Sequence, residues 1–354
     1  MTETIHVGFL GGTELPGNVG TLLCNLRRLL RSSDRQFDCD LLVSENVDTL
    51  DGFRTFRIAH DPVETARERL RTLWKAAEQY ANSEQPDVLM QVTRFPTHGS
   101  AVALAGWRTD TPTITRLAGD NFREYKFSTG VSEKFRTFLL KNVIAMTAVH
   151  IPESVIVLGP NGRRDIERRL RRGDIWEIPQ PVDQSRFSPG NASELRASMD
   201  VASDDRLLLT VGRVSRRKGA ETIRRVAPSC DGTWVVVGDG PMREKLADTP
   251  GVRAPGRVPH DQIVDYYRAA DLYVHPSLHE GVPNVLLEAT ACGTPCIARD
   301  VGECASIATK TFEDPDRIPD LVLADYEAPD LPDRFTPDRL GQKYEKLLIE
   351  TAFE

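Results

Sequence analysis

The sequence predicts an α/β protein with two domains, each a parallel sheet with helices on both faces. Short apolar runs alternate with longer amphipathic stretches along the chain, and this alternation is typical of parallel sheets. The 354 residues suit two domains of roughly 100 to 200 residues each. An apolar content of 40% is enough to pack a core in both domains.

The first strand and the first helix enclose a loop that contains glycine. Residues 5–10 are predicted to form a strand, residues 11–20 the loop, and residues 21–30 an amphipathic helix. This order is typical of a nucleotide-binding fold. The loop lacks Gly-x-Gly-x-x-Gly in register, and no acidic residue at a strand end about 20 residues later is placed to bind a ribose. Dinucleotide binding is therefore not expected.

Further elements follow in the N-terminal half. Strands are predicted at residues 41–43, 86–92, 111–116, 155–160 and 175–178, and a strongly basic helix is predicted at residues 161–172. An Asp38-Cys39-Asp40 triplet lies at the mouth of the strand at 41–43, and we expect it to have a structural role. Pro179 and Pro181 stiffen the chain that follows, which predicts a hinge between the two domains.

The C-terminal half places cations and glycines after its strands. An apolar strand at 207–211 runs into Gly212-Arg213, and Lys218-Gly219 precede a helix from residue 221. Arginine offers a forked set of donors and lysine a point charge, the usual pair for binding phosphate. A second strand, 233–237, ends in a turn at Gly238, and residues 255–259 precede a helix at 261–270.

The most informative stretch, residues 275–295, carries Glu280 and Glu288 eight positions apart around the start of one helix. Pro283 is predicted as the first helical residue, because proline has no amide hydrogen to lose there. The helix is predicted to run over 284–291 and to stop at Gly293. Its free amides and positive dipole end favour a phosphate at the preceding loop.

The two carboxylates suit hydroxyl groups better than phosphate. Asn284 and Glu288 share one helix face, and Glu280 approaches from the loop, so the acids flank the phosphate position. Carboxylates accept charge-assisted hydrogen bonds from paired hydroxyls. A diphosphate with a sugar at each end, a sugar nucleotide, fits this pattern. The alternative from spacing alone is an ordinary helix with one solvated Glu and a Glu in a turn.

The same stretch resembles the Glu-x7-Glu signature of the retaining glycosyltransferases of family 4, which have the GT-B fold. The resemblance covers Glu280-Gly281-Val282-Pro283-Asn284, then Glu288-Ala289, and the closing Gly293-Thr294-Pro295. It implies two Rossmann-like domains that face each other across a deep cleft. Segments around 207–219, 233–241 and 255–259 agree with the family in order and spacing.

The resemblance implies a role for each matching residue. Arg213 and Lys218 would neutralise the donor diphosphate, together with the helix start at Gly281, Val282, Pro283 and Asn284. Glu288 would bind the ribose, and Glu280 would hold sugar hydroxyls and position the anomeric carbon. The remaining matches line the cleft: Gly238 in a donor loop, the backbone at Val258 beside the nucleobase, and Gly17 and Asn18 in the N-terminal glycine loop.

The chain departs from the family after the strand at 111–116. Many members have a histidine there that contacts the transferred sugar, whereas this chain has Arg116 and Leu117. We expect Asp120 to accept a proton from the acceptor hydroxyl and Arg116 to hold a phosphate of the acceptor or donor. A plain Gly-Asp turn is the alternative. His98, in a loop of the same half, is a second candidate for the missing contact.

The predicted domains are an N-terminal acceptor-binding domain at 1–180, a C-terminal nucleotide-sugar-binding domain at 181–335, and a final helix at 336–354 that returns toward the first domain. The net charge of −7 argues against a dedicated nucleic-acid binder. Six scattered cysteines without Cys-x-x-Cys argue against zinc and, with no signal peptide, favour the cytoplasm.

Two segments are candidates for peripheral contact with the inner face of the membrane. Residues 133–143 combine phenylalanines and leucines with Lys134, Arg136 and Lys141, and residues 163–172 are rich in arginine. The alternative is a core-packing helix plus a solvated basic helix. No apolar run approaches the roughly 18 residues needed to span a bilayer.

These patterns predict a retaining, hexosyltransferase-like enzyme that moves a sugar from a nucleotide-sugar donor to a glycan, a lipid-linked or a small-molecule acceptor. No metal or other cofactor is expected, since cations and a helix end can stabilise the leaving diphosphate. Two alternatives remain open. One is a non-catalytic subunit that binds sugar nucleotides, and the other is a GT-B-fold epimerase or phosphorylase.

Overall fold

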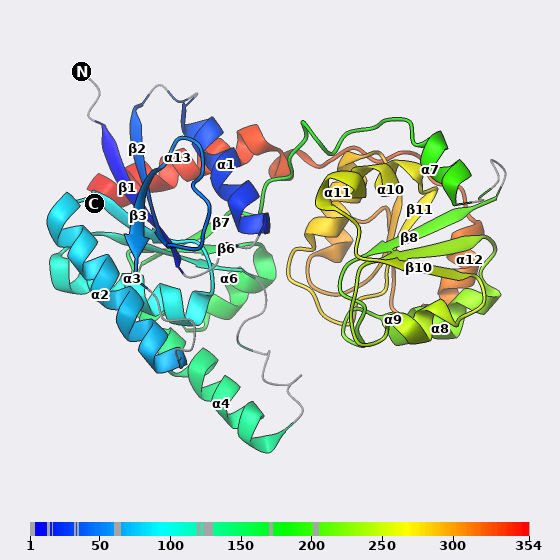
Figure 1. Cartoon of the computed structure of the whole chain (residues 1–354), viewed down its shortest axis with the longest axis horizontal. Coiled ribbons are helices and arrows are strands. Elements are labelled where there is room, and N and C mark those ends of the chain that lie inside the picture. Colours follow the sequence, from blue (N-terminus) through cyan, green and yellow to red (C-terminus); the bar gives the residue numbers. More distant parts are fainter. Residues whose placement is uncertain are drawn as a thin grey trace. The chain divides into compact units, whose positions relative to one another are not determined.

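A computed structural model describes residues 4–12, 15, 17–31, 33, 35–59, 65–118, 122, 130–169, 173–199, 201 and 205–353. The chain forms two compact units (Figure 1). Unit 1 comprises Met1–Pro181 and Pro337–Glu354, and unit 2 comprises Val182–Thr336. Asp120 lies outside the described residues.

Unit 1 is built on a seven-stranded sheet in the order β3-β2-β1-β4-β5-β6-β7. Every pairing in it is parallel. The strands are β1 (Ile5–Gly12), β2 (Phe37–Ser44), β3 (Arg54–Ile58), β4 (Val88–Gln91), β5 (Thr113–Leu117), β6 (Ser154–Val157) and β7 (Asp174–Glu177). The strand order reverses between β1 and β4, so the loops that follow these two strands form the edge where doubly wound sheets bind ligands.

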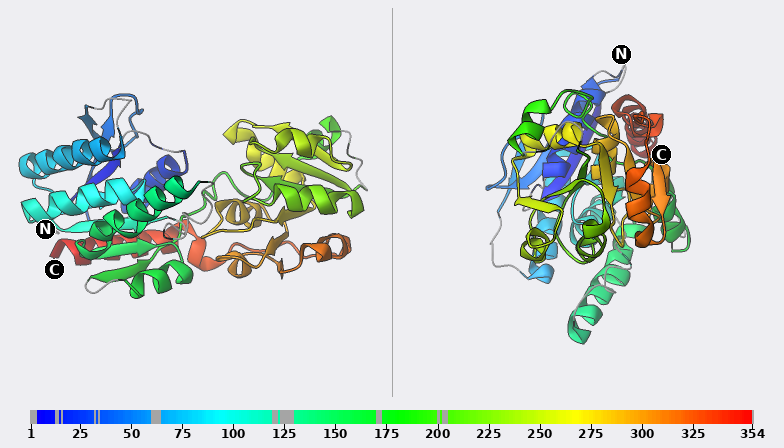
Figure 2. Two further views of the ribbon diagram at one scale, coloured as in Figure 1. Left: turned by 90° about the horizontal axis from the view of Figure 1, so that it is seen from below. Right: turned by 90° about the vertical axis from the view of Figure 1, so that its right-hand side faces the viewer.

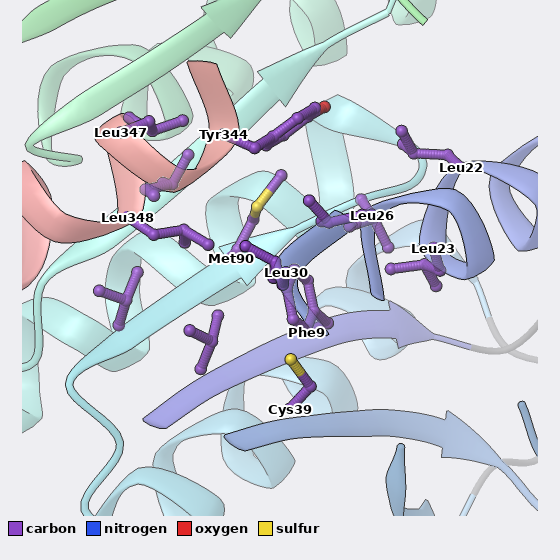
Figure 3. Packing of buried hydrophobic residues seen from close by; sticks show 14 of the residues in the cluster. Phe9, Leu22, Leu23, Leu26, Leu30, Cys39, Met90, Tyr344, Leu347 and Leu348 are labelled. Atoms are coloured by element: carbon purple, nitrogen blue, oxygen red, sulfur yellow. The ribbon is translucent and has the colours of Figure 1, made fainter. Parts of the chain in front are cut away.

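Helices cover both faces of this sheet. The helices of unit 1 are α1 (Gly17–Arg31), α2 (Ala66–Glu84), α3 (Ser100–Thr109), α4 (Val131–Asn142), α5 (Thr147–His150), α6 (Pro160–Glu167) and α13 (Pro337–Phe353). Side chains of α2 and α3 share one core cluster with Leu10 and Leu89. Side chains of α1 and α13 share the other with Phe9 and Met90 (Figure 3).

The last helix, α13, packs within unit 1 although it follows unit 2 in the chain. Its buried residues Leu340, Tyr344 and Leu347 belong to the same apolar cluster as strand β1. At Gly341 a Cβ atom would lie 2.9 Å from the Leu29 side chain of α1. The absence of a side chain there lets the two helices approach closely.

Unit 2 repeats the architecture with six parallel strands in the order β10-β9-β8-β11-β12-β13. The strands are β8 (Leu207–Val211), β9 (Thr233–Val237), β10 (Val252–Gly256), β11 (Leu272–His275), β12 (Cys296–Arg299) and β13 (Lys310–Phe312). The helices are α7 (Ser193–Ser198), α8 (Ala220–Val226), α9 (Arg243–Ala247), α10 (Ile263–Ala269), α11 (Asn284–Ala291) and α12 (Ile318–Leu323). Its strand order reverses between β8 and β11. The predicted α/β class with two parallel sheets is therefore confirmed.

The structure corrects two predicted helix starts. Helix α1 begins at Gly17 rather than at residue 21, so Gly17 and Asn18 form its first turn instead of a loop. Helix α11 begins at Asn284, and Pro283 precedes it with ψ 108°, an extended conformation. The Pro283 carbonyl accepts hydrogen bonds from Leu286 (3.1 Å) and Leu287 (3.4 Å), as the residue that caps a helix N-terminus does. Proline is tolerated there because an amide at that position has no partner within the helix.

Asp40 lies inside β2, not at the mouth of a strand, and is 2% exposed. His6 Nε2, Arg54 Nη2 and the Tyr80 hydroxyl all lie 2.7 Å from its Oδ2 atom. Burial alone would raise the pKa of Asp40, but these partners outweigh it and hold the pKa well below its ordinary value. The carboxylate therefore has a structural function, joining β1, β2, β3 and α2.

Candidate functional site

The loops after β8 and β11 form the edge of unit 2 at which doubly wound sheets bind ligands. Gly219 has φ +82°, and a Cβ atom on it would lie 2.4 Å from the Pro276 carbonyl oxygen, so only glycine fits this close approach. The Leu278 amide donates to the Arg217 carbonyl across the loops (2.9 Å). These contacts hold the two loops together, so that Lys218 in one loop lies close to Glu280 in the other.

Lys218 and His275 converge on one oxygen of Glu280. Lys218 Nζ lies 2.5 Å and His275 Nε2 3.0 Å from Glu280 Oε1. Burial would raise the pKa of Glu280, but His275 and Lys218 outweigh it and lower the pKa to about 2. Among the described residues, Glu280 Oε2 accepts no hydrogen bond. The site thus holds an ionised carboxylate with one oxygen left for a ligand.

Glu288 lies one helical turn into α11 and contacts α10. The Tyr267 hydroxyl donates to Glu288 Oε2 (2.8 Å). Burial raises the pKa of Glu288 to about 7, against the hydrogen bond from Tyr267 and the charge of Arg186. The two glutamates of the motif therefore differ in charge near neutral pH, because Glu280 accepts hydrogen bonds from Lys218 and His275 whereas Glu288 is desolvated.

A row of buried aromatic rings supports both glutamates. The Tyr267 and Tyr273 rings are 5.7 Å apart, and the Tyr273 and His275 rings stack with centroids 6.1 Å apart. Sequence reasoning did not identify His275 or Tyr273 as site residues. A usable signal exists, because residues two apart in a strand point to the same face and β11 places Tyr273 and His275 in that relation.

Arg213 is exposed in the same loop as Lys218. A small pocket is lined by Gly212, Arg213, Lys218 and His275, so the two predicted phosphate-binding cations border one space. A larger hollow between α7 and α10, lined by residues such as Glu194 and Gln262, contains none of the predicted site residues.

The segment before α11 is held in place from the loop after β12. The Glu303 amide donates to the Gly281 carbonyl (2.9 Å), and Gly302, with φ +60°, leaves no room for a Cβ beside the Glu280 carbonyl. Val282 is buried. The amides of Asn284 and Val285 have no acceptor within the described part of the chain, so they remain available to an anion.

Gly238 brings two loops together. A Cβ atom on it would lie 1.9 Å from the Gly212 carbonyl oxygen, and its φ is +138°. In this structure its close contact is with the β8 loop, and its predicted approach to a donor stays a prediction. Val258 is partly buried between β10 and α10, and its predicted nucleobase contact also stays a prediction.

In unit 1, Gly17 and Asn18 begin α1 at the edge of the sheet where β1 ends. His98 lies beside this edge in a π-helical turn, Phe95–Gly99, and is fully buried. Its Nδ1 atom is 3.0 Å from Thr97 Oγ1, and its Nε2 has no hydrogen-bond partner in the described ranges. Burial, aided by nearby arginines, lowers the pKa of His98 to about 3. His98 is therefore a neutral ring pressed against Gly12, where a Cβ would lie 2.0 Å away.

Arg116 is 2% exposed. Its Nη2 donates to Gln180 Oε1 (3.3 Å), beside the hydroxyl of Tyr344 on α13. The guanidinium thus contacts the segment that leaves unit 1 and the helix that returns to it. Its predicted phosphate contact, like the predicted role of Asp120, stays a prediction.

In the described ranges, no group of three or more His, Cys, Asp or Glu side chains is arranged to hold a metal ion. No helix among those residues is both long enough and apolar enough to cross a membrane.

Comparison with known proteins identifies the domain that carries the two glutamates. Residues 205–325 match the family model described as glycosyl transferases group 1. This segment is a group 1 glycosyltransferase domain. The chain is 30% identical over 230 residues to TuaC of Bacillus subtilis (strain 168), a provisionally named teichuronic acid biosynthesis glycosyltransferase. That match covers 64% of this chain and 56% of the relative, and other named relatives are spanned to a smaller share of their length.

Solved structures share the whole fold at low sequence identity. Anabaena HepE in complex with UDP-glucose has a TM-score of 0.74 and 16% identity, covering 98% of this chain and 100% of that one. A UDP-GlcNAc 2-epimerase from Methanocaldococcus jannaschii has a TM-score of 0.63 and 14% identity, covering 98% and 100%. The group 1 glycosyltransferase domain therefore belongs to a chain with the GT-B fold, which the sequence predicted.

Proposed function

We propose that this protein is a retaining glycosyltransferase that transfers a sugar from a nucleotide-sugar donor to a hydroxyl group of a glycan, a lipid-linked or a small-molecule acceptor. The observation that carries the proposal is the convergence of Lys218 and His275 on Glu280, next to the open amides that begin α11. A sugar diphosphate requires cations and free amides for its phosphates and an ionised hydrogen-bond acceptor for its hydroxyls.

Each group has a task in the transfer. Arg213, Lys218 and the amides at the start of α11 stabilise the negative charge that develops on the leaving diphosphate. Glu280 Oε2 accepts hydrogen bonds from hydroxyls of the transferred sugar and orients its anomeric carbon. Glu288 accepts hydrogen bonds from the ribose. These cations make a metal unnecessary, and transfer in the presence of EDTA tests that point.

The donor proposed for the first test is UDP-glucose, the ligand named in the HepE structure. None of the six cysteines, all of them described residues, is in a disulfide, which suits a reaction in the cytoplasm. Asp120 and His98 are the candidates in unit 1 for assisting the acceptor and the sugar.

The decisive experiment is a thermal-shift and isothermal-titration panel of UDP-, GDP- and ADP-sugars on the full chain, followed by a donor-hydrolysis assay and NMR of the released anomer. Glu280→Gln and Lys218→Ala should each abolish turnover, and Arg216→Ala, an exposed neighbour of Lys218, is the matched control. Binding without hydrolysis or transfer would establish the non-catalytic subunit. Release of a 2-epimer would establish an epimerase, and no binding of any nucleotide would refute the site.

A further inference from the structure

Helix α4 carries an apolar stripe flanked by basic side chains. Val131, Phe135, Phe138 and Leu139 follow the spacing i, i+4, i+7 and i+8, which places them on one face of a helix with about 3.6 residues per turn. By the same geometry Lys134 and Lys141 border one side of this stripe and Arg136 borders the other. This arrangement is typical of helices that lie at a membrane interface.

The stripe is open to solvent. The exposed fraction is 87% for Val131, 67% for Phe135 and 41% for both Phe138 and Leu139. Val143, just after the helix, is 53% exposed and extends the apolar surface. None of the twelve residues of α4 is buried, and Figure 1 and the right-hand view of Figure 2 show α4 extending away from the sheet of unit 1. Thus α4 is not the core-packing helix that was the alternative from sequence.

The second basic segment of unit 1 does not share these properties. In α6, Arg163 lies 3.5 Å from Glu167 and donates to the Ile175 carbonyl. Arg169, just after α6, lies 3.8 Å from Asp165 and stacks over Phe122. These arginines serve the fold of unit 1, so α4 is the candidate that remains.

We propose that α4 is a docking surface for an anionic lipid bilayer. The apolar stripe would enter the boundary between headgroups and acyl chains, and Lys134, Arg136 and Lys141 would contact the anionic headgroups. Charge decides between a bilayer and a second copy of this chain. Two copies meeting through the stripe would bring their basic borders together, whereas an anionic surface is complementary to them. The chain carries a net charge of −7, so the basic character of α4 is local.

Flotation of the full chain with liposomes tests this surface without any assay of activity. The probes are vesicles of neutral phosphatidylcholine and vesicles in which about one third of the lipid is phosphatidylglycerol. We expect binding to the anionic vesicles only, and weaker binding as salt is raised. Phe135→Ser combined with Leu139→Ser should lower the bound fraction about tenfold, and Lys134→Glu combined with Arg136→Glu should do the same.

The matched control is Leu323→Ser, which removes an apolar side chain that is 61% exposed in unit 2. It should bind vesicles like the parent chain, and all variants should keep the parent's melting temperature because each substituted side chain is exposed. Absence of binding to anionic vesicles, or binding that the α4 variants leave unchanged, would overturn the proposal. Light scattering that shows a dimer lost in Phe135→Ser/Leu139→Ser, without vesicle binding, would assign the surface to a second copy instead.

Discussion

The raised pKa of Glu288 predicts that donor binding weakens below neutral pH. Glu288 has a pKa of about 7 because it is desolvated beside Tyr267, whose hydroxyl donates to it (2.8 Å). An ionised carboxylate can accept hydrogen bonds from both hydroxyls of a ribose, and those bonds are the stronger charge-assisted kind. Protonation removes the charge and turns one oxygen into a donor. The ionised form of Glu288 is therefore the one expected to bind the donor.

The size of the effect follows from that pKa. A group with a pKa of about 7 is about 10% ionised at about pH 6 and about 90% ionised at about pH 8. If only the ionised form binds, the affinity falls about tenfold over this range, or about 1.4 kcal/mol. Isothermal titration with a sugar nucleotide measures it cleanly, because the diphosphate is a diester without a proton to lose near pH 7.

Two variants separate Glu288 from other titrating groups. Glu288→Gln should bind the donor weakly and with an affinity that does not change between these pH values. Lys218→Ala should bind weakly at both, yet retain the tenfold ratio. An affinity of the parent chain that is constant with pH, or a Glu288→Gln variant that keeps the pH dependence, would refute the assignment of Glu288 to the ribose.

Two further predictions concern the neighbours of buried carboxylates. His275 Nε2 lies 3.0 Å from Glu280 Oε1, so His275→Ala should lower kcat for donor turnover about 10- to 100-fold. His275→Gln, whose amide can reach the same oxygen, should stay near the parent, as should the control His260→Ala, which changes an exposed histidine. Equal losses of kcat in His275→Gln and His275→Ala would contradict this role of His275. Asp40→Asn should lower the free energy of unfolding of the full chain in urea by about 2 kcal/mol at neutral pH. The pKa of Asp40 is depressed in the folded state, so the carboxylate contributes to the free energy of unfolding above the ordinary carboxyl pKa, and this contribution is lost as the pH falls below that value. A stability difference between Asp40→Asn and the parent that persists unchanged in acid would argue against the Arg54 and His6 contacts as its source.

Several elements follow from local patterns alone. The predicted strands at 207–211 and 233–237 and the predicted helix at 284–291 have the same bounds as β8, β9 and α11. Both strands are mainly apolar and mainly buried, and helix α11 is followed by Gly293, which adopts φ +77°. Such segments are predictable because nearly all their constraints lie within a few residues.

Two elements of unit 1 have a weaker signal in the sequence. Strand β3 and helix α2, at Arg54–Ile58 and Ala66–Glu84, were not predicted. The strand is short, partly exposed and rich in arginine, so it lacks a strong apolar signal. The helix carries a capping box formed by Thr65 and Glu68, a signal that was present in the sequence and not used.

By itself the sequence determined the fold class, the two glutamates eight positions apart and the cations expected near phosphate, since motif spacing and strand composition are local properties. Only the tertiary structure decided the state of those groups. Lys218 and Glu280 are 62 positions apart, and parallel strands bring their loops together at one edge of a sheet. Burial then separates the pKa values of Glu280 and Glu288, because desolvation and neighbouring charge depend on what the fold places around each carboxylate.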